Sequence, residues 1–370
     1  MIPLTQSPRF MLIGLVDSRE DKDRSFAQFE EAQSLIHTFG GQVYAAVAQN
    51  STRADTSTFI GKGKAQELGE TIQREKIDVV VINANVKPRQ LNALKSVFRA
   101  SNPDIQVWDR VDLILNIFRK HASTAEAKLQ IRLASVRHMG PLIFGMGKVM
   151  SQQGGGIGTR GIGETNTERM NRHWKDELKK IRDELDKLTA NRTQQMDRRK
   201  KNGLSTISIV GYTNAGKTTL FNRIGKKQNL AENALFATLD SSVSKLYLHT
   251  LKREVFITDT IGFIQDLPPD LIEAFKSTLL ETVHADLLLH VIDASDPWMD
   301  DKIAVVEQIL YDLQIDTKHQ LYVFNKSDAM KEGMKEILTT RYGNKIAQFV
   351  SAKTGDGIEG LVKAIEESLS

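Results

Sequence analysis

Short apolar runs alternate with longer amphipathic stretches over the first part of the chain. Four runs have the length and composition of buried strands: residues 10–16, 43–48, 78–83 and 105–109. The stretches between them have the spacing of apolar residues that is typical of helices; one ends at Gly40 and Gly41, and another opens at Pro88, where proline is tolerated. This alternation predicts an N-terminal domain, residues 1–109, built on a small, mostly parallel α/β sheet.

A different pattern follows, that of long helices. Residues 111–139 contain neither proline nor glycine and predict one long helix, whereas residues 154–163 hold six glycines in ten positions, too many for a regular element. Farther on, apolar residues recur every three or four positions, as in a helix that packs along another: Met170, Trp174, Leu178, Ile181, Leu185 and Leu188. We expect this helix to run from about residue 165 to 201, roughly 55 Å at 1.5 Å per residue. The two helices would form a projecting antiparallel hairpin, residues 110–203, with the glycine-rich loop at its tip.

The charge of the chain is concentrated in this hairpin. Residues 110–201 contain 20 Lys and Arg against 10 Asp and Glu, a net charge of +10, so the remainder of the chain, whose total is +4, carries −6. Such asymmetry is typical of proteins that bind a polyanion, although a solvated helical surface produces the same pattern. Charge alone leaves both interpretations open.

Composition excludes several classes of protein. With 40% hydrophobic and 26% charged residues, 370 residues suffice for two or three ordinary globular domains. No segment has the roughly 18 apolar residues of a spanning helix, and no secretory signal opens the chain, so we expect a cytoplasmic protein. The absence of cysteine rules out disulfides, thiolate zinc sites and cysteine nucleophiles.

The strongest chemical signal opens the last domain, residues 204–370. Gly211 and Gly216-Lys217-Thr218 have the spacing of a P-loop, preceded by the apolar stretch TISIV and followed by a helical one. Backbone N–H groups of such a loop face phosphate oxygens, the lysine reaches the β and γ phosphates, and the threonine hydroxyl binds Mg²⁺. The loop residues predicted to contact nucleotide are Gly211, Tyr212, Thr213, Asn214, Ala215, Gly216, Lys217, Thr218 and Thr219. A second glycine- and lysine-containing stretch, residues 60–68, lacks this spacing and is interpreted as a turn into a helix.

Three later motifs favour guanine as the base. Each follows an apolar run: Asp259-Thr260-Ile-Gly262, Asn325-Lys326-Ser-Asp328 and Ser351-Ala352-Lys353. Asp259 is placed to hold Mg²⁺ through water, and the Gly262 amide to sense the γ phosphate. The Asp328 carboxylate can accept both the ring N–H and the exocyclic amine of guanine, a pair of donors that adenine lacks. The motifs stand in the order found in GTPases, which predicts GTP and GDP as ligands on a Ras-like doubly wound sheet; a P-loop kinase or ATPase with an accidental NKxD is the alternative.

The P-loop with Asn214, the stretch LFATLD (residues 235–240), DTIGFIQDLP (259–268) and especially GGGIGTRGIGET (154–165) resemble the HflX family of translational GTPases. The resemblance covers nearly the whole chain. It implies a factor that binds ribosomal RNA of the large subunit and helps to split or rescue stalled ribosomes under stress. It also implies that Phe236 and Thr238 belong to the switch, with Thr238 closing on Mg²⁺ and the γ phosphate. The chain departs from the family pattern at residues 162–168, IGETNTE, and we expect its last stretch, LVKAIEESLS, to be the last helix of the GTPase domain.

Two features of the motifs bear on catalysis. Phe263 stands where Ras-like enzymes have the glutamine that orients water, so hydrolysis should be slow until ribosomes stimulate it. Alternatively, Phe263 packs in the core, and Gln265 or a backbone group serves. Asn214 is the residue that could hold K⁺ beside the phosphates, or it is an ordinary loop amide. The expected catalytic residues are Asn214, Lys217, Thr238, Asp259 and Gly262.

Three functions fit these observations. In the first, a monomeric ribosome-associated GTPase docks its hairpin on ribosomal RNA; the contacts we expect are Arg160, Arg169, Arg172 and Lys175. In the second, a signalling GTPase binds a protein partner through the hairpin as a coiled-coil arm. The third, a tRNA-modifying GTPase, shares the asparagine-containing P-loop, but the sequence holds no cysteine or cofactor motif for that chemistry.

Overall fold

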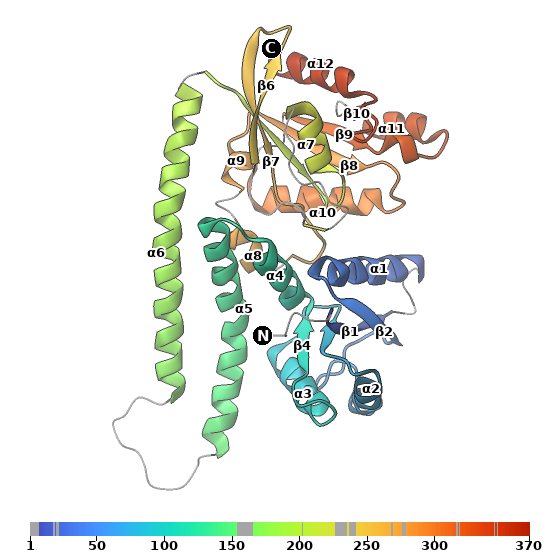
Figure 1. The fold of residues 1–370 in the computed structure, drawn as a ribbon, viewed down its shortest axis with the longest axis vertical. Coiled ribbons are helices and arrows are strands. Elements are labelled where there is room, and N and C mark those ends of the chain that lie inside the picture. The colour runs from blue at the N-terminus through green and yellow to red at the C-terminus, as the bar shows by residue number, and fades with distance from the viewer. Residues whose placement is uncertain are drawn as a thin grey trace. The chain divides into compact units, whose positions relative to one another are not determined.

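The computed structural model describes most of the chain (Figure 1). Described are residues 7–17, 19, 22–153, 166–201, 203–225, 235–236, 242–267, 269–275, 279–315, 317, 319–343, 345 and 347–370. Contacts divide the chain into two compact units, Met1–Lys120 with Ile131–Glu184, and His121–Gln130 with Leu185–Ser370. No helix among these described residues is long and apolar enough to span a membrane.

The first unit contains the parallel sheet that the sequence predicts. Its strand order is β2-β1-β3-β4, and every pairing is parallel. The strands are β1 (Arg9–Val16), β2 (Gln42–Asn50), β3 (Val79–Ile82) and β4 (Gln106–Asp109), which confirms all four expected runs. The connections are α1 (Lys22–Phe39), α2 (Lys62–Glu75) and α3 (Pro88–Arg99). Gly61 caps α2, so the stretch at residues 60–68 is indeed a turn into a helix.

The expectation of one helix over residues 111–139 is wrong, because the structure has two helices there. They are α4 (Arg110–His121) and α5 (Ala125–Gln153). At the break, the Thr124 hydroxyl oxygen accepts a hydrogen bond from the Ala127 N–H at 3.2 Å, the pattern of a helix N-cap. A second helix therefore begins after Thr124. The sequence prediction missed this start because it considered only the absence of proline and glycine. In addition, α5 continues through Pro141 to Gln153.

Helix α6 (Asn166–Lys201) agrees with its predicted range and runs antiparallel to α5. The Trp174 indole N–H donates to the Val136 carbonyl at 2.8 Å, and a Cβ on Gly140 would lie 2.8 Å from the Trp174 ring. One turn later Arg132 pairs with Glu177 at 2.9 Å. Leu178, Ile181 and Leu185 are buried. Met170 is 38% exposed, so the apolar seam begins at Trp174 and not at Met170.

The second unit is built on a six-stranded sheet of order β10-β9-β8-β5-β7-β6. All pairings are parallel except that of β6 with β7. The strands are β5 (Thr206–Gly211), β6 (Ser242–Leu248), β7 (Arg253–Asp259), β8 (Leu287–Asp293), β9 (Gln320–Asn325) and β10 (Ala347–Phe349). The helices are α7 (Lys217–Gly225), α8 (Pro269–Ala274), α9 (Leu280–Val283), α10 (Met299–Asp312), α11 (Met334–Tyr342) and α12 (Ile358–Ser368). This is the predicted doubly wound α/β fold, in which ligands bind beyond the carboxyl ends of the parallel strands.

Candidate nucleotide-binding site

The P-loop connects β5 to α7 and depends on two glycines. Gly211 has a φ of 150°, and a Cβ there would lie 2.3 Å from the Val291 carbonyl oxygen. Gly216 has a φ of 89°, and a Cβ there would lie 2.2 Å from the Asn325 side-chain nitrogen. Any side chain at either position would push neighbouring strands away, so the loop can take this path only with glycine.

Lys217 is held inside the loop. Its ammonium group donates to the main-chain carbonyl of Tyr212 at 2.7 Å, and the residue is only 6% exposed. Burial lowers the pKa of Lys217 to about 8, partly opposed by the negative charge of Asp259. The lysine is therefore fixed at the start of α7, where phosphate oxygens would supply the compensating charge.

The other predicted loop residues differ in exposure. Tyr212, Thr213 and Ala215 are buried, Gly216, Thr218 and Thr219 are half-buried, and Asn214 is exposed. Asn214 has a φ of 61°, in the left-handed region that asparagine tolerates better than most residues. The Asn214 side chain, which the sequence assigns to K⁺, is therefore open to solvent.

The Thr218 hydroxyl donates to a carboxylate oxygen of Asp259 at 2.7 Å. Thr218 lies in the first turn of α7, and Asp259 ends β7 with no exposed surface. A hydroxyl and a carboxylate are oxygen ligands of the kind that Mg²⁺ prefers. The two residues therefore fit a Mg²⁺ ion held by one of them directly and by the other through water.

The segment after Asp259 is joined to the P-loop by main-chain hydrogen bonds. The Thr213 N–H donates to the Phe263 carbonyl at 2.7 Å, and the Phe263 N–H donates to the Gly211 carbonyl at 3.1 Å. A Cβ on Gly262 would lie 2.9 Å from the Lys217 nitrogen, so Gly262 sits against the lysine. The Phe263 side chain is 3% exposed and packs in the core.

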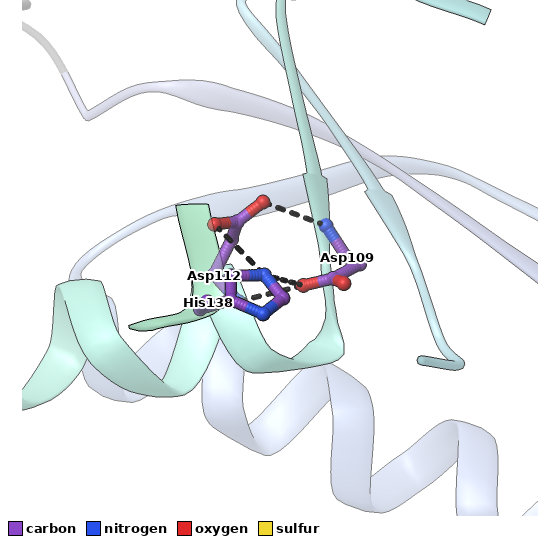
Figure 2. A group of neighbouring side chains, drawn as sticks. All are labelled: Asp109, Asp112 and His138. Atoms are coloured by element: carbon purple, nitrogen blue, oxygen red, sulfur yellow. Dashed lines mark hydrogen bonds and ion pairs between the residues drawn. The ribbon is translucent and has the colours of Figure 1, made fainter. Parts of the chain in front are cut away.

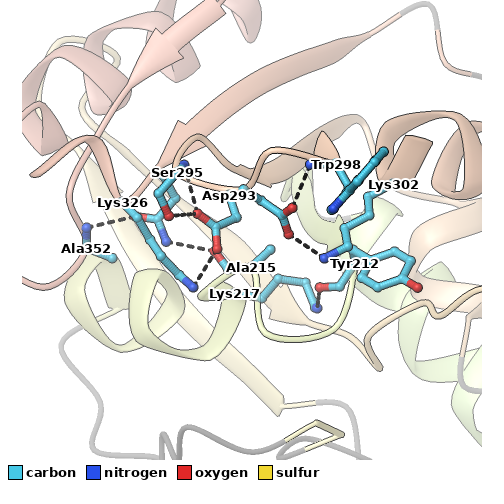
Figure 3. A network of polar contacts seen from close by, with 11 residues as sticks. Tyr212, Ala215, Lys217, Asp293, Ser295, Trp298, Lys302, Lys326 and Ala352 are labelled. Atoms are coloured by element: carbon cyan, nitrogen blue, oxygen red, sulfur yellow. Dashed lines mark hydrogen bonds and ion pairs between the residues drawn. The ribbon is translucent and has the colours of Figure 1, made fainter. Parts of the chain in front are cut away.

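Asn325 links two of the predicted motifs to each other. Its side-chain N–H donates to the Ala215 carbonyl at 2.8 Å, while its side-chain oxygen accepts the Ala352 N–H at 2.9 Å (Figure 3). The residue is 2% exposed. The asparagine of the NKxD motif thus connects the P-loop to the loop that follows β10.

Lys326 and Asp328 belong to the NKxD motif at the end of β9. Lys326 pairs with Asp293 at 2.6 Å, and Asp293 also accepts hydrogen bonds from Ser295 (Figure 3). Asp328 is exposed, and a hydrogen bond from the Ser351 side chain lowers the pKa of its carboxyl group. The carboxylate is therefore ionised at neutral pH, as the recognition of guanine requires.

Sequence reasoning missed two residues of this arrangement. Arg223, in the last turn of α7, donates to the carbonyls of Ala352 (3.1 Å) and Lys353 (2.5 Å) and so holds the loop after β10. Asp293 follows the apolar run of β8, and its place at the carboxyl end of a buried strand could have identified it. Arg223 has no comparable signal, because its partners are 129 and 130 positions away.

The remaining predicted residues belong to other segments or lie outside the described parts of the chain. Thr238 and Arg160 are outside the described residues. Phe236 is buried, with 2% exposure. The predicted RNA contacts on the first turns of α6 are all exposed: Arg169, Arg172 and Lys175.

The fold and the motifs at its strand ends define a P-loop GTPase. Three family models match the chain: GTP-binding GTPase N-terminal over residues 27–119, GTP-binding GTPase Middle Region over 121–199, and 50S ribosome-binding GTPase over 206–326.

Relatives of known family match almost the full length. GTPase HflX of Caldanaerobacter subterraneus is 40% identical over 361 residues, 98% of this chain and 80% of the relative. GTPase HflX of Escherichia coli is 35% identical over 349 residues, 94% of this chain and 80% of the relative. A solved structure, SsGBP in complex with GDP, is 23% identical with a TM-score of 0.54 and covers 97% of this chain and 98% of its own, which supports the fold. The chain belongs to the HflX family of GTPases, enzymes that bind and hydrolyse GTP.

Proposed function

We propose that this GTPase binds the large ribosomal subunit and, in its GTP state, splits or rescues stalled ribosomes under stress. The observation that carries the proposal is the match of residues 206–326 to a family model described as a 50S ribosome-binding GTPase. The basic character of residues 110–201 agrees with an RNA partner, since phosphate contacts dominate the affinity of proteins for nucleic acids. We expect the protein to act in the cytoplasm and as a monomer.

Each residue of the P-loop and of the neighbouring motifs would have a separate role in binding the nucleotide. Lys217 would neutralise the β and γ phosphates, and Asp328 would read the base. Thr218 and Asp259, with Thr238 from the switch, would hold Mg²⁺, which supplies charge neutralisation for the transferring phosphoryl group. Asn214 would hold K⁺ at the same phosphates, and the Gly262 amide would sense the γ phosphate.

The ribosome would complete the catalytic site. The Phe263 ring packs in the core and cannot orient water. Gln265 is half-buried, and its main-chain N–H donates to the Tyr212 hydroxyl at 2.9 Å, so this glutamine is attached to the P-loop. We therefore expect slow hydrolysis by the isolated protein and faster hydrolysis on the ribosome.

The hairpin would carry the contact with ribosomal RNA. Arg169, Arg172 and Lys175 present positive charge on α6, and the glycine-rich sequence at residues 154–163 offers backbone N–H groups and Arg160, whose planar guanidinium can stack or bind phosphate in two places. Helix α6 ends at Lys201, a few residues before β5, and so leads from the hairpin to the P-loop strand.

The test measures GTP hydrolysis with and without large subunits. Arg160→Ala, or replacement of residues 154–163 by a short Gly-Ser linker, should abolish stimulation by the ribosome and leave intrinsic GTP binding intact. Arg99→Ala, an exposed arginine at the end of α3, is the matched control and should be stimulated fully. Full stimulation of the linker variant would contradict the proposed role of the tip. It would favour the second candidate, a signalling GTPase whose hairpin binds a protein, in which binding is insensitive to ribonuclease and weakly dependent on salt.

A further inference from the structure

Three metal-binding side chains meet in the first unit, in a region that GTP hydrolysis does not use. Asp109 is the last residue of β4, Asp112 lies in the first turn of α4, and His138 lies on α5 (Figure 2). One ligand atom from each residue lies within 4.8 Å of the other two.

The start of α4 places the two carboxylates side by side. The Asp112 N–H donates to one oxygen of Asp109 at 2.8 Å, and the Asp109 N–H approaches an oxygen of Asp112 at 3.3 Å, a reciprocal cap of the helix. These bonds fix both side chains on the same side of the turn. These hydrogen bonds explain where the two carboxylates lie. They do not balance the two negative charges, which are next to each other.

Arg110, which stands between the two aspartates in sequence, does not neutralise them. Its guanidinium pairs with Glu31 and donates to the Asn83 side-chain oxygen at 2.7 Å. His138 is therefore the group that faces both carboxylates. Burial by itself lowers the pKa of His138, but the hydrogen bonds and charges of Asp109 and Asp112 raise it to about 10, so the metal-free imidazole is protonated at neutral pH and a metal ion would displace that proton.

The distances in the cluster are long for an ion pair. The imidazole Nε2 of His138 lies 3.3 Å from Asp109 and 3.5 Å from Asp112. Charge-assisted N–H···O bonds are usually about 2.7–2.9 Å. At metal–ligand distances of about 2.1 Å, two ligand atoms of a tetrahedral site are roughly 3.4 Å apart. The two separations from Nε2 are thus compatible with ligand atoms around a metal ion, as they are with an ion pair.

Burial gives a second, independent indication. Asp109 has no exposed surface, and its Oδ2 atom has no hydrogen-bond partner within the described parts of the chain. A wholly buried carboxylate oxygen is costly unless a donor or a cation compensates it. Once His138 has given up its proton, the two carboxylates and the neutral imidazole carry a charge of −2, which one divalent cation balances.

We propose that Asp109, Asp112 and His138 bind one divalent transition-metal ion of the Zn²⁺ or Mn²⁺ class, with water in the remaining positions. Two carboxylates and one imidazole suit such an ion, and the side chains of Asp112 and His138 are 20% and 18% exposed, so solvent reaches the open side. The ion fastens the start of α4 to α5 and thereby joins the sheet of this unit to its helices.

Isothermal titration calorimetry tests the proposal. The full chain is freed of nucleotide, treated with a chelator, and titrated with ZnCl₂. We expect one equivalent to bind at micromolar concentration or tighter, and Co²⁺ to give the visible absorption of a tetrahedral site at the same stoichiometry. His138→Gln should weaken Zn²⁺ binding at least tenfold. His173→Gln, which changes an exposed histidine of α6, is the matched control and should bind as the wild type does.

Absence of Zn²⁺ and Mn²⁺ binding by the wild type would overturn the proposal and leave an ion pair as the account of the cluster. Equal affinity of His138→Gln and the wild type would also overturn it. If His138→Gln does not fold, judged by near-UV circular dichroism, Asp112→Asn decides in its place, because it preserves the shape of the side chain. A tenfold loss in Asp112→Asn supports the site, and an unchanged affinity contradicts it.

Discussion

The Thr218 hydroxyl donates a hydrogen bond to the Asp259 carboxylate at 2.7 Å, across 41 positions of sequence. The contact joins the first turn of α7 to the carboxyl end of β7. Each residue belongs to a motif that predicts Mg²⁺ binding, and the fold places the two motifs within one hydrogen bond of each other. Mg²⁺ and this hydrogen bond would compete for the same oxygens.

Thr218→Ala should weaken hydrolysis through the metal. Removal of the hydroxyl takes away a predicted Mg²⁺ ligand, so we expect the rate of GTP hydrolysis to fall about tenfold or more, equivalent to roughly 1.4 kcal/mol. The Mg²⁺ concentration that gives half-maximal rate should rise. Thr218→Ser, which keeps the hydroxyl, should restore both quantities. An unchanged Mg²⁺ dependence in Thr218→Ala would contradict the assignment.

Lys217→Ala should instead weaken nucleotide binding both with and without Mg²⁺.

Asp328→Asn should change the preferred base. The amide keeps an acceptor but replaces the second acceptor with a donor, which matches xanthine better than guanine. We expect affinity for GTP to fall roughly ten- to a hundredfold and affinity for XTP to rise. Fluorescence titration with labelled GDP and XDP measures both. Asp356→Asn, an exposed carboxylate in the next loop, is the control, and equal affinity for GDP in Asp328→Asn and the wild type would contradict the prediction.

Asn214 should confer dependence on potassium. If its side-chain oxygen holds K⁺ beside the phosphates, the ribosome-stimulated rate in KCl should exceed that in NaCl by about tenfold, because the ion supplies charge where other GTPases use an arginine finger. Asn214→Ala should have equal rates in the two salts. Equal rates for the wild type would mean that Asn214 is an ordinary loop amide.

His290 should make the GTPase domain sensitive to acid. The residue is 1% exposed on β8, where Gln320 contacts its ring nitrogen at 3.0 Å, and burial lowers its pKa to about 3. Between pH 6.5, its usual value, and pH 3, the unfolded chain binds a proton that the folded chain excludes. The free energy of unfolding therefore falls as the pH falls, by about 1.4 kcal/mol per unit well below pH 6.5.

Thermal denaturation between pH 7 and about 4 measures this effect. His290→Gln removes the titrating group and keeps a polar side chain, so its melting temperature should depend less on pH than that of the wild type. His284→Gln changes an exposed histidine and should leave the slope as it is. Parallel curves for His290→Gln and the wild type would show that another group causes the loss of stability in acid.

Patterns set by local chemistry were predictable. Strands β1, β3 and β8 are nearly continuous apolar runs because central parallel strands are buried on both faces, and the P-loop needs its glycines at fixed spacing. The end of α4 was not predictable, since residues 122–124 are compatible with a helix and only the Thr124 cap interrupts it. The exposure of Met170 depends on packing that its spacing does not contain.

Contacts between residues that are far apart in the sequence could not be predicted from the pattern of one sequence. The NKxD motif indicated a guanine site, but the bonds of Asn325 to Ala215 and Ala352 join segments 110 and 27 positions away. The cluster of Asp109, Asp112 and His138 likewise depends on how α5 packs, because the histidine is 26 positions or more from either aspartate. Neither arrangement has a spacing rule that would identify it.

Co-sedimentation with large ribosomal subunits tests the proposed function most directly. The protein is mixed with purified subunits in the presence of a non-hydrolysable GTP analogue or of GDP, at several salt concentrations. We predict that it pellets with the subunits in the analogue and much less in GDP, and that binding falls steeply with salt, as expected for contacts to RNA phosphates. Failure to pellet in either nucleotide, at low salt and with active GTPase, would contradict the account.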